Sequence, residues 1–113
     1  MVYSGDDVLT LPLLAVGAVG VIGVATHWAG AETAEMIAAH RKGDVAEAVR
    51  LNARLIASYD YETGDEAPNP VPSKALLNLL GLRVGQCRPP MGPVPDGLED
   101  RARAVLAGLG RAS

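Results

Sequence analysis

Two short segments near the start of the chain have the pattern of buried strands: the first opens into a polar Gly-Asp-Asp turn, and the second is a glycine-studded, β-branched run. The first, at residues 2–5, opens into Asp6 and Asp7, and the second covers residues 20–24. A helix-sized apolar segment, Val8–Val16, separates them. Strand, helix and strand at this spacing are typical of a parallel α/β sheet or barrel. We therefore expect two parallel strands near residues 2–5 and 20–24.

The carboxyl ends of parallel strands meet at one edge of a sheet, which is where such folds place their chemistry. Gly5–Asp7 and Ile22–Thr26 would then face one site. A glycine at position 5 would let an anion approach backbone N–H groups. Asp6 and Asp7 would point to opposite faces, so they do not form an acid–base pair. Capping of the following helix by Asp7 is an equally good interpretation.

Helical periodicity dominates the chain from residue 31 onward. Helices are expected over 31–42, 44–59 and 74–80, with a last one after Asp96. Asp44 with Glu47 and Asp96 with Glu99 have the spacing of a capping box, in which two side chains satisfy each other's backbone N–H groups. Prolines and Gly64 predict an irregular loop over residues 60–72. The organisation is thus two βα units in residues 1–43 and a helical segment in residues 44–113.

Composition narrows the function classes. The chain has 113 residues, a net charge of −3 and no run of Lys or Arg, so nucleic acid is not an expected partner. One cysteine, Cys87, and two histidines give neither a disulfide nor a metal site. The two lysines, Lys42 and Lys74, fall in predicted helices with nothing nearby to lower an amine pKa. No catalytic nucleophile can be named from these residues.

A membrane span is the main competing interpretation. Val8–Ala31 contains no Asp, Glu, Lys or Arg and is long enough to cross a bilayer as a helix. Pro12 and four glycines argue against one continuous helix, because each interior glycine costs about 1 kcal/mol relative to alanine. We expect no membrane association, although a small membrane-anchored protein remains the alternative.

Taken together, these motifs resemble the dihydrodipicolinate synthase family in its actinobacterial style. The part that resembles the seventh and eighth barrel strands comprises Tyr3–Asp7, Leu11–Pro12, Gly17–Ile22 and Val24–Ala25. The part that resembles the carboxyl-terminal helical segment comprises Asn69–Pro72, Lys74, Leu79–Leu82, Gly85–Arg88 and Met91–Pro93. The resemblance covers essentially the whole chain in the right order.

This resemblance implies the last two βα units of a (β/α)8 TIM barrel followed by a C-terminal helical segment. It implies a lyase that condenses pyruvate with L-aspartate 4-semialdehyde through a lysine Schiff base, on the way to diaminopimelate and lysine. The Schiff-base lysine of the family belongs to the sixth strand, which would precede Met1. We therefore expect no catalytic residue in this chain and no activity of the chain alone.

The resemblance also assigns substrate contacts. Ile22 matches the residue whose backbone carbonyl lies against pyruvate, and Gly5 matches a glycine near the carboxylate of the semialdehyde. Asp6 and Asp7 match the acids that border this pocket, whereas Gly23 replaces the usual serine. No cofactor or metal is implied, and the family suggests a cytoplasmic homo-oligomer, a tetramer. The alternatives are another pyruvate-dependent aldolase of the same family or a non-catalytic helical association module.

Overall fold

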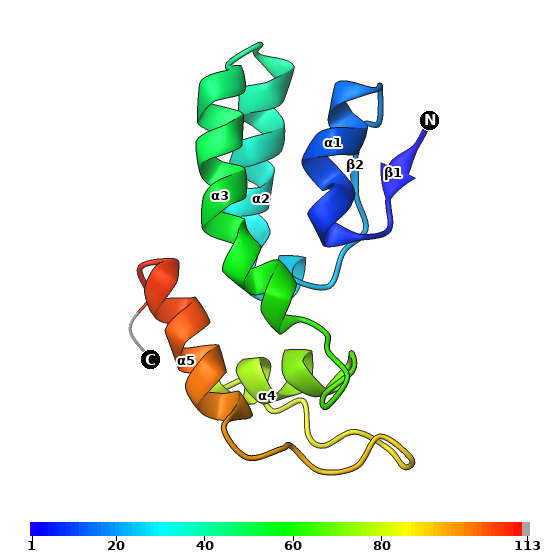
Figure 1. Ribbon diagram of the computed structural model, residues 1–113, viewed down its shortest axis with the longest axis vertical. Coiled ribbons are helices and arrows are strands. Elements are labelled where there is room, and N and C mark those ends of the chain that lie inside the picture. Colours follow the sequence, from blue (N-terminus) through cyan, green and yellow to red (C-terminus); the bar gives the residue numbers. More distant parts are fainter. Residues whose placement is uncertain (112–113) are drawn as a thin grey trace. The chain divides into compact units, whose positions relative to one another are not determined.

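The computed structural model describes residues 1–111, which fold as two compact units, Met1–Ile56 and Ala57 onward. Figure 1 shows the elements in chain order: β1 (Tyr3–Ser4), the short 3-10 helix η1 (Asp7–Leu9), α1 (Thr10–Ala15), β2 (Gly20–Val21), α2 (Thr26–Arg41), α3 (Val45–Tyr61), α4 (Val71–Leu79) and α5 (Leu98–Gly108). The division that the sequence predicts after residue 43 stays a prediction.

The expected parallel strands are present. β1 pairs with β2 in parallel, with Tyr3 opposite Gly20 and Ser4 opposite Val21. Backbone hydrogen bonds extend the pairing at both ends, from the Val19 N–H to the Val2 carbonyl and from the Ile22 N–H to the Ser4 carbonyl, each at 2.8 Å. The regular strands are shorter than the sequence suggests, but they lie inside the predicted ranges.

The segment between the strands is helical, as its apolar pattern predicts. α1 contacts both β1 and β2, and its Thr10 and Leu14 side chains are buried. Pro12 lies in the first turn of α1, where a missing N–H breaks no intrahelical hydrogen bond. This crossover is what brings the two strand ends to the same edge of the small sheet.

The start of α2 differs from the prediction, because the helix begins at Thr26 rather than at residue 31. The Thr26 hydroxyl donates to the Gly23 carbonyl at 2.9 Å and stabilises the first turn. Trp28 and Ala29 are buried, and this burial favours an ordered backbone here. Ala29 has non-helical dihedral angles (φ −114°, ψ 27°), so the helix is kinked near the point where the sequence predicts its start.

α3 follows its predicted periodicity, with buried Ala48, Leu51, Leu55 and Tyr59. Asp44 caps it by accepting from the Glu47 N–H at 3.1 Å. The other half of the predicted capping box is wrong. The Asp44 N–H already donates to the Ala39 carbonyl at 2.9 Å, and the Glu47 carboxylate accepts from Arg50 at 2.6 and 2.7 Å instead.

In the second unit, α4 and α5 pack on each other. α4 begins at Val71, earlier than predicted, because Pro72 is compatible with the first turn of a helix. α5 begins after Gly97, which has a left-handed φ of 81°, and no side chain caps it, so the predicted cap by Asp96 is wrong. The core residues shared by the two helices include Ala75, Leu76, Ala102 and Leu106.

Within residues 1–111, no helix combines the length and the apolar character needed to cross a membrane.

Candidate functional site

The four residues assigned from the sequence, Gly5, Asp6, Asp7 and Ile22, follow the two paired strands, and we call them the strand-end site. Because β1 and β2 run in parallel, both groups of residues leave the sheet at the same edge. A direct contact links the two strand ends, since the Val24 N–H donates to Asp7 Oδ2 at 2.6 Å. The first unit thus brings together the residues that the sequence predicts to share a site.

The adjacent carboxylates have different surroundings. Asp6 is exposed, and its backbone is held by the Ser4 hydroxyl, which donates to the Asp6 carbonyl and accepts from its N–H. Asp7 is only 2% exposed. It does not cap the following helix: the cap position of η1 is Asp6, which makes no side-chain cap hydrogen bond. Asp6 is therefore the carboxylate that can meet a solute directly.

Ile22 presents an open backbone carbonyl. Its side chain is 75% exposed, and its N–H is already used by Ser4. Within residues 1–111, the Ile22 carbonyl oxygen accepts no hydrogen bond. A carbonyl left open at a strand end is available to a ligand or to a donor from elsewhere in a larger assembly.

The two glycines at this edge, Gly5 and Gly23, differ in whether a side chain would fit in their place. A Cβ at position 5 would meet no atom within 4 Å, and the φ of Gly5 is not left-handed. Nothing in the described chain demands a glycine there, which leaves room for a ligand to approach the backbone. A Cβ on Gly23, in contrast, would overlap the Asp7 carboxylate. The glycine at position 23 is therefore required by the side chain of Asp7.

The remaining chemistry-bearing residues do not join the strand-end site. His27 lies in the first turn of α2, where its Nδ1 is 2.8 Å from the Val24 carbonyl oxygen. Lys42 follows α2 and is exposed. Among residues 1–111, no cluster of His, Cys, Asp or Glu has the arrangement needed to hold a metal ion.

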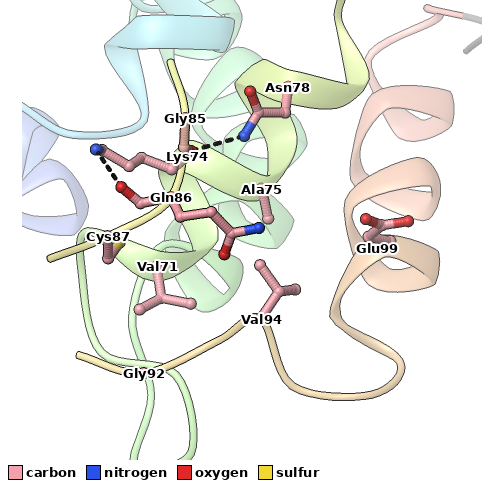
Figure 2. A pocket seen from close by; sticks show the side chains of 10 residues that line it. All are labelled: Val71, Lys74, Ala75, Asn78, Gly85, Gln86, Cys87, Gly92, Val94 and Glu99. Carbon is pink, nitrogen blue, oxygen red and sulfur yellow. Dashed lines mark hydrogen bonds between the residues drawn. The ribbon is translucent and has the colours of Figure 1, made fainter. Parts of the chain in front are cut away.

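The second unit contains a cavity of about 330 Å³ between α4, the loop after it and the start of α5 (Figure 2). Asn78 holds this loop from both ends of its amide, donating to the Gly85 carbonyl at 3.0 Å and accepting from the Val84 N–H at 3.2 Å. Lys74 Nζ donates to the Gln86 carbonyl at 3.0 Å. Lys74 thus ties this loop to α4.

The comparisons with known proteins agree with this arrangement. Residues 1–108 match the dihydrodipicolinate synthetase family. A 4-hydroxy-tetrahydrodipicolinate synthase of Parasynechococcus marenigrum is 43% identical over 108 residues, which are 96% of this chain and 35% of that protein. The enzyme of the same name from Listeria innocua is 42% identical over 111 residues, 98% of this chain and 37% of that protein.

Solved structures give the same result. Dihydrodipicolinate synthase from Bacillus anthracis has a TM-score of 0.84 and 41% identity, over 93% of this chain and 35% of that one. The enzyme from Cyanidioschyzon merolae, solved with lysine bound, has a TM-score of 0.88 and 38% identity, over 96% of this chain and 36% of that one.

The structural neighbours of the chain are TIM-barrel enzymes of this class, and the match covers about a third of each of them. The chain belongs to the dihydrodipicolinate synthetase family. It spans about a third of the length of the curated relatives it matches.

Proposed function

We propose that this chain provides the carboxyl-terminal part of a barrel that condenses pyruvate with L-aspartate 4-semialdehyde, as 4-hydroxy-tetrahydrodipicolinate synthases do. The proposal is supported by relatives of that name, which are 42–43% identical over 96–98% of the chain. The reaction requires a lysine amine that forms a Schiff base with the pyruvate ketone, with loss of water. The lysines of this chain, Lys42 and Lys74, follow α2 and lie in α4 respectively, so the amine must come from another part of the assembled barrel.

The observation that carries the proposal is the open carbonyl of Ile22 at the end of β2. In our proposal this oxygen lies against pyruvate and the lysine that binds it. Gly5 leaves its backbone accessible to the carboxylate of the semialdehyde, and the exposed Asp6 borders the same side of the pocket. The chain would thus position both substrates without donating the nucleophile.

We further propose that the assembled enzyme is a cytoplasmic homo-oligomer that needs no cofactor. Its small-molecule partners are its two substrates, pyruvate and aspartate semialdehyde. Identity of about 40% supports the family more strongly than the choice among its pyruvate-dependent aldolases. A different second substrate for the same pyruvate enamine is therefore the competing proposal.

Reconstitution tests this function. The segment of the Parasynechococcus marenigrum enzyme that precedes its matched region is fused in frame before residue 1 of this chain. The chimera should consume pyruvate and aspartate semialdehyde together, whereas the chain alone should show no pyruvate-dependent condensation. A folded chimera without activity, or with activity only toward another aldehyde, would reject the proposed substrate pair.

A further inference from the structure

The Asp7 carboxylate is buried and accepts a hydrogen bond within the protein, whereas its neighbour Asp6 is exposed. Its 2% exposure would be costly for a charged group without a hydrogen-bonding partner. The partner is the Val24 N–H, which lies 2.6 Å from Oδ2, a short distance for an N–H···O hydrogen bond. The side chain of one strand end therefore holds the backbone of the other.

Two such anchors flank the Ile22 carbonyl. On one side the Ile22 N–H donates to the Ser4 carbonyl at 2.8 Å. On the other side the Val24 N–H donates to Asp7. Peptide groups are planar, so the open carbonyl can change direction only through the backbone dihedrals between these two anchors. Half of those dihedrals belong to Gly23, the residue type with the greatest backbone freedom, so the Asp7 anchor limits motion that the sequence itself would permit.

Asp7 and Gly23 also depend on each other sterically. A Cβ at position 23 would overlap both carboxylate oxygens and the carboxyl carbon of Asp7. Any larger residue at position 23 requires the carboxylate to move away. The hydrogen bond to Val24 would then be lost or lengthened.

We propose that Asp7 is a positioning residue, which fixes the direction of the Ile22 carbonyl through Val24 and which needs glycine at position 23 to do so. The effect of this anchor on the placement of pyruvate rests on the proposed function. It assigns Asp7 an indirect role, through the backbone of β2, in place of direct contact with the semialdehyde. Asp6 keeps the direct role.

A double-mutant cycle on the full 113-residue chain tests the anchor. In Asp7→Ala, the Val24 amide proton should move upfield and exchange with solvent at least tenfold faster. Gly23→Ala should have the same effect, because the added methyl group displaces the carboxylate. The double variant should resemble Asp7→Ala alone, since no carboxylate remains to displace. Asp7→Asn should retain most of the shift, because its amide oxygen can still accept.

Asp6→Ala is the matched control, since it removes the adjacent, exposed carboxylate. It should leave the Val24 amide resonance and its exchange rate unchanged. A Val24 amide that is insensitive to Asp7→Ala would overturn the proposal, as would two single effects that multiply in the double variant.

The consequence for substrate is read in the chimera described above. Asp7→Ala should raise the KM for pyruvate about tenfold while changing the KM for the semialdehyde less than twofold, and Asp7→Asn should restore most of the loss. A purely structural role would lower the yield of folded protein and kcat without this split between substrates. An inactive chimera with the unchanged chain rejects the proposed function, and the Val24 experiment then decides the anchor by itself.

Discussion

The Tyr61 hydroxyl donates a hydrogen bond to the Pro72 carbonyl at 2.9 Å, which joins the end of α3 to the first turn of α4 across the intervening loop. The ring is 2% exposed, and the guanidinium of Arg101 in α5 lies 5.8 Å from its centre. One side chain therefore connects three helical segments of the second unit. The loop over residues 62–70, which the sequence predicts as irregular, is closed by this contact.

Tyr61 should make the stability of the second unit sensitive to alkaline pH. Burial raises the pKa of Tyr61 to about 12, with a nearby Glu99 acting in the same direction and Arg101 opposing. A raised pKa means that the folded state favours the neutral phenol. The free energy of unfolding should be constant below pH 10, the ordinary tyrosine value, and fall by about 2–3 kcal/mol as the pH rises toward 12.

Urea unfolding followed by circular dichroism at several pH values measures this loss. Tyr61→Phe should remove the pH dependence and cost about 1 kcal/mol at neutral pH through the lost hydrogen bond. Tyr3→Phe, at a ring that is 49% exposed, is the matched control and should keep the alkaline loss. An alkaline loss of the same size in Tyr61→Phe would contradict the assignment.

Asn78 should hold the loop after α4 through both ends of its amide. Asn78→Asp keeps the acceptor for the Val84 N–H but loses the donor to the Gly85 carbonyl, whereas Asn78→Ala loses both. Each bond is worth about 0.5–1.5 kcal/mol, so hydrogen exchange at Val84 should accelerate more in the alanine variant than in the aspartate variant. If the Val84 amide exchanged at the rate of the unchanged chain in both variants, the loop would be held by other contacts.

Asp44 should stabilise α3 alone, without help from the side chain of Glu47. Asp44→Ala should lower the free energy of unfolding by about 1 kcal/mol, a typical value for the loss of an N-cap. Glu47→Ala should have little effect, because the Glu47 carboxylate is paired with Arg50 at the surface and such pairs contribute little. Thermal unfolding of the two variants makes the comparison, and a larger loss in Glu47→Ala than in Asp44→Ala would indicate that Glu47 also caps the helix.

Local patterns predicted the elements that are set by local rules. A glycine-studded, β-branched run predicts β2. The periodic Ala48, Leu51 and Leu55 predict α3, because burial of one helix face requires that spacing. The predicted start of α2 at residue 31 is wrong, because the Thr26 hydroxyl and the buried Trp28 stabilise a helical turn before Gly30.

The strand-end site was predictable only in part. Its members follow from the parallel strands and from the resemblance to the family. The bond between Asp7 and Val24 joins residues seventeen positions apart, so no local periodicity encodes it. The cavity beside α4 likewise depends on how Asn78 and Lys74 fold the following loop back, which only the tertiary structure reveals.

The central claim is that this chain positions pyruvate but leaves the Schiff base to a lysine elsewhere in the barrel. Trapping with pyruvate and borohydride in the chimera, followed by peptide mapping, tests it most directly. We predict one stoichiometric adduct, located in the part derived from the Parasynechococcus marenigrum enzyme, and none on Lys42 or Lys74. A stoichiometric adduct on either of these two lysines, or no adduct in a folded chimera, would contradict the account.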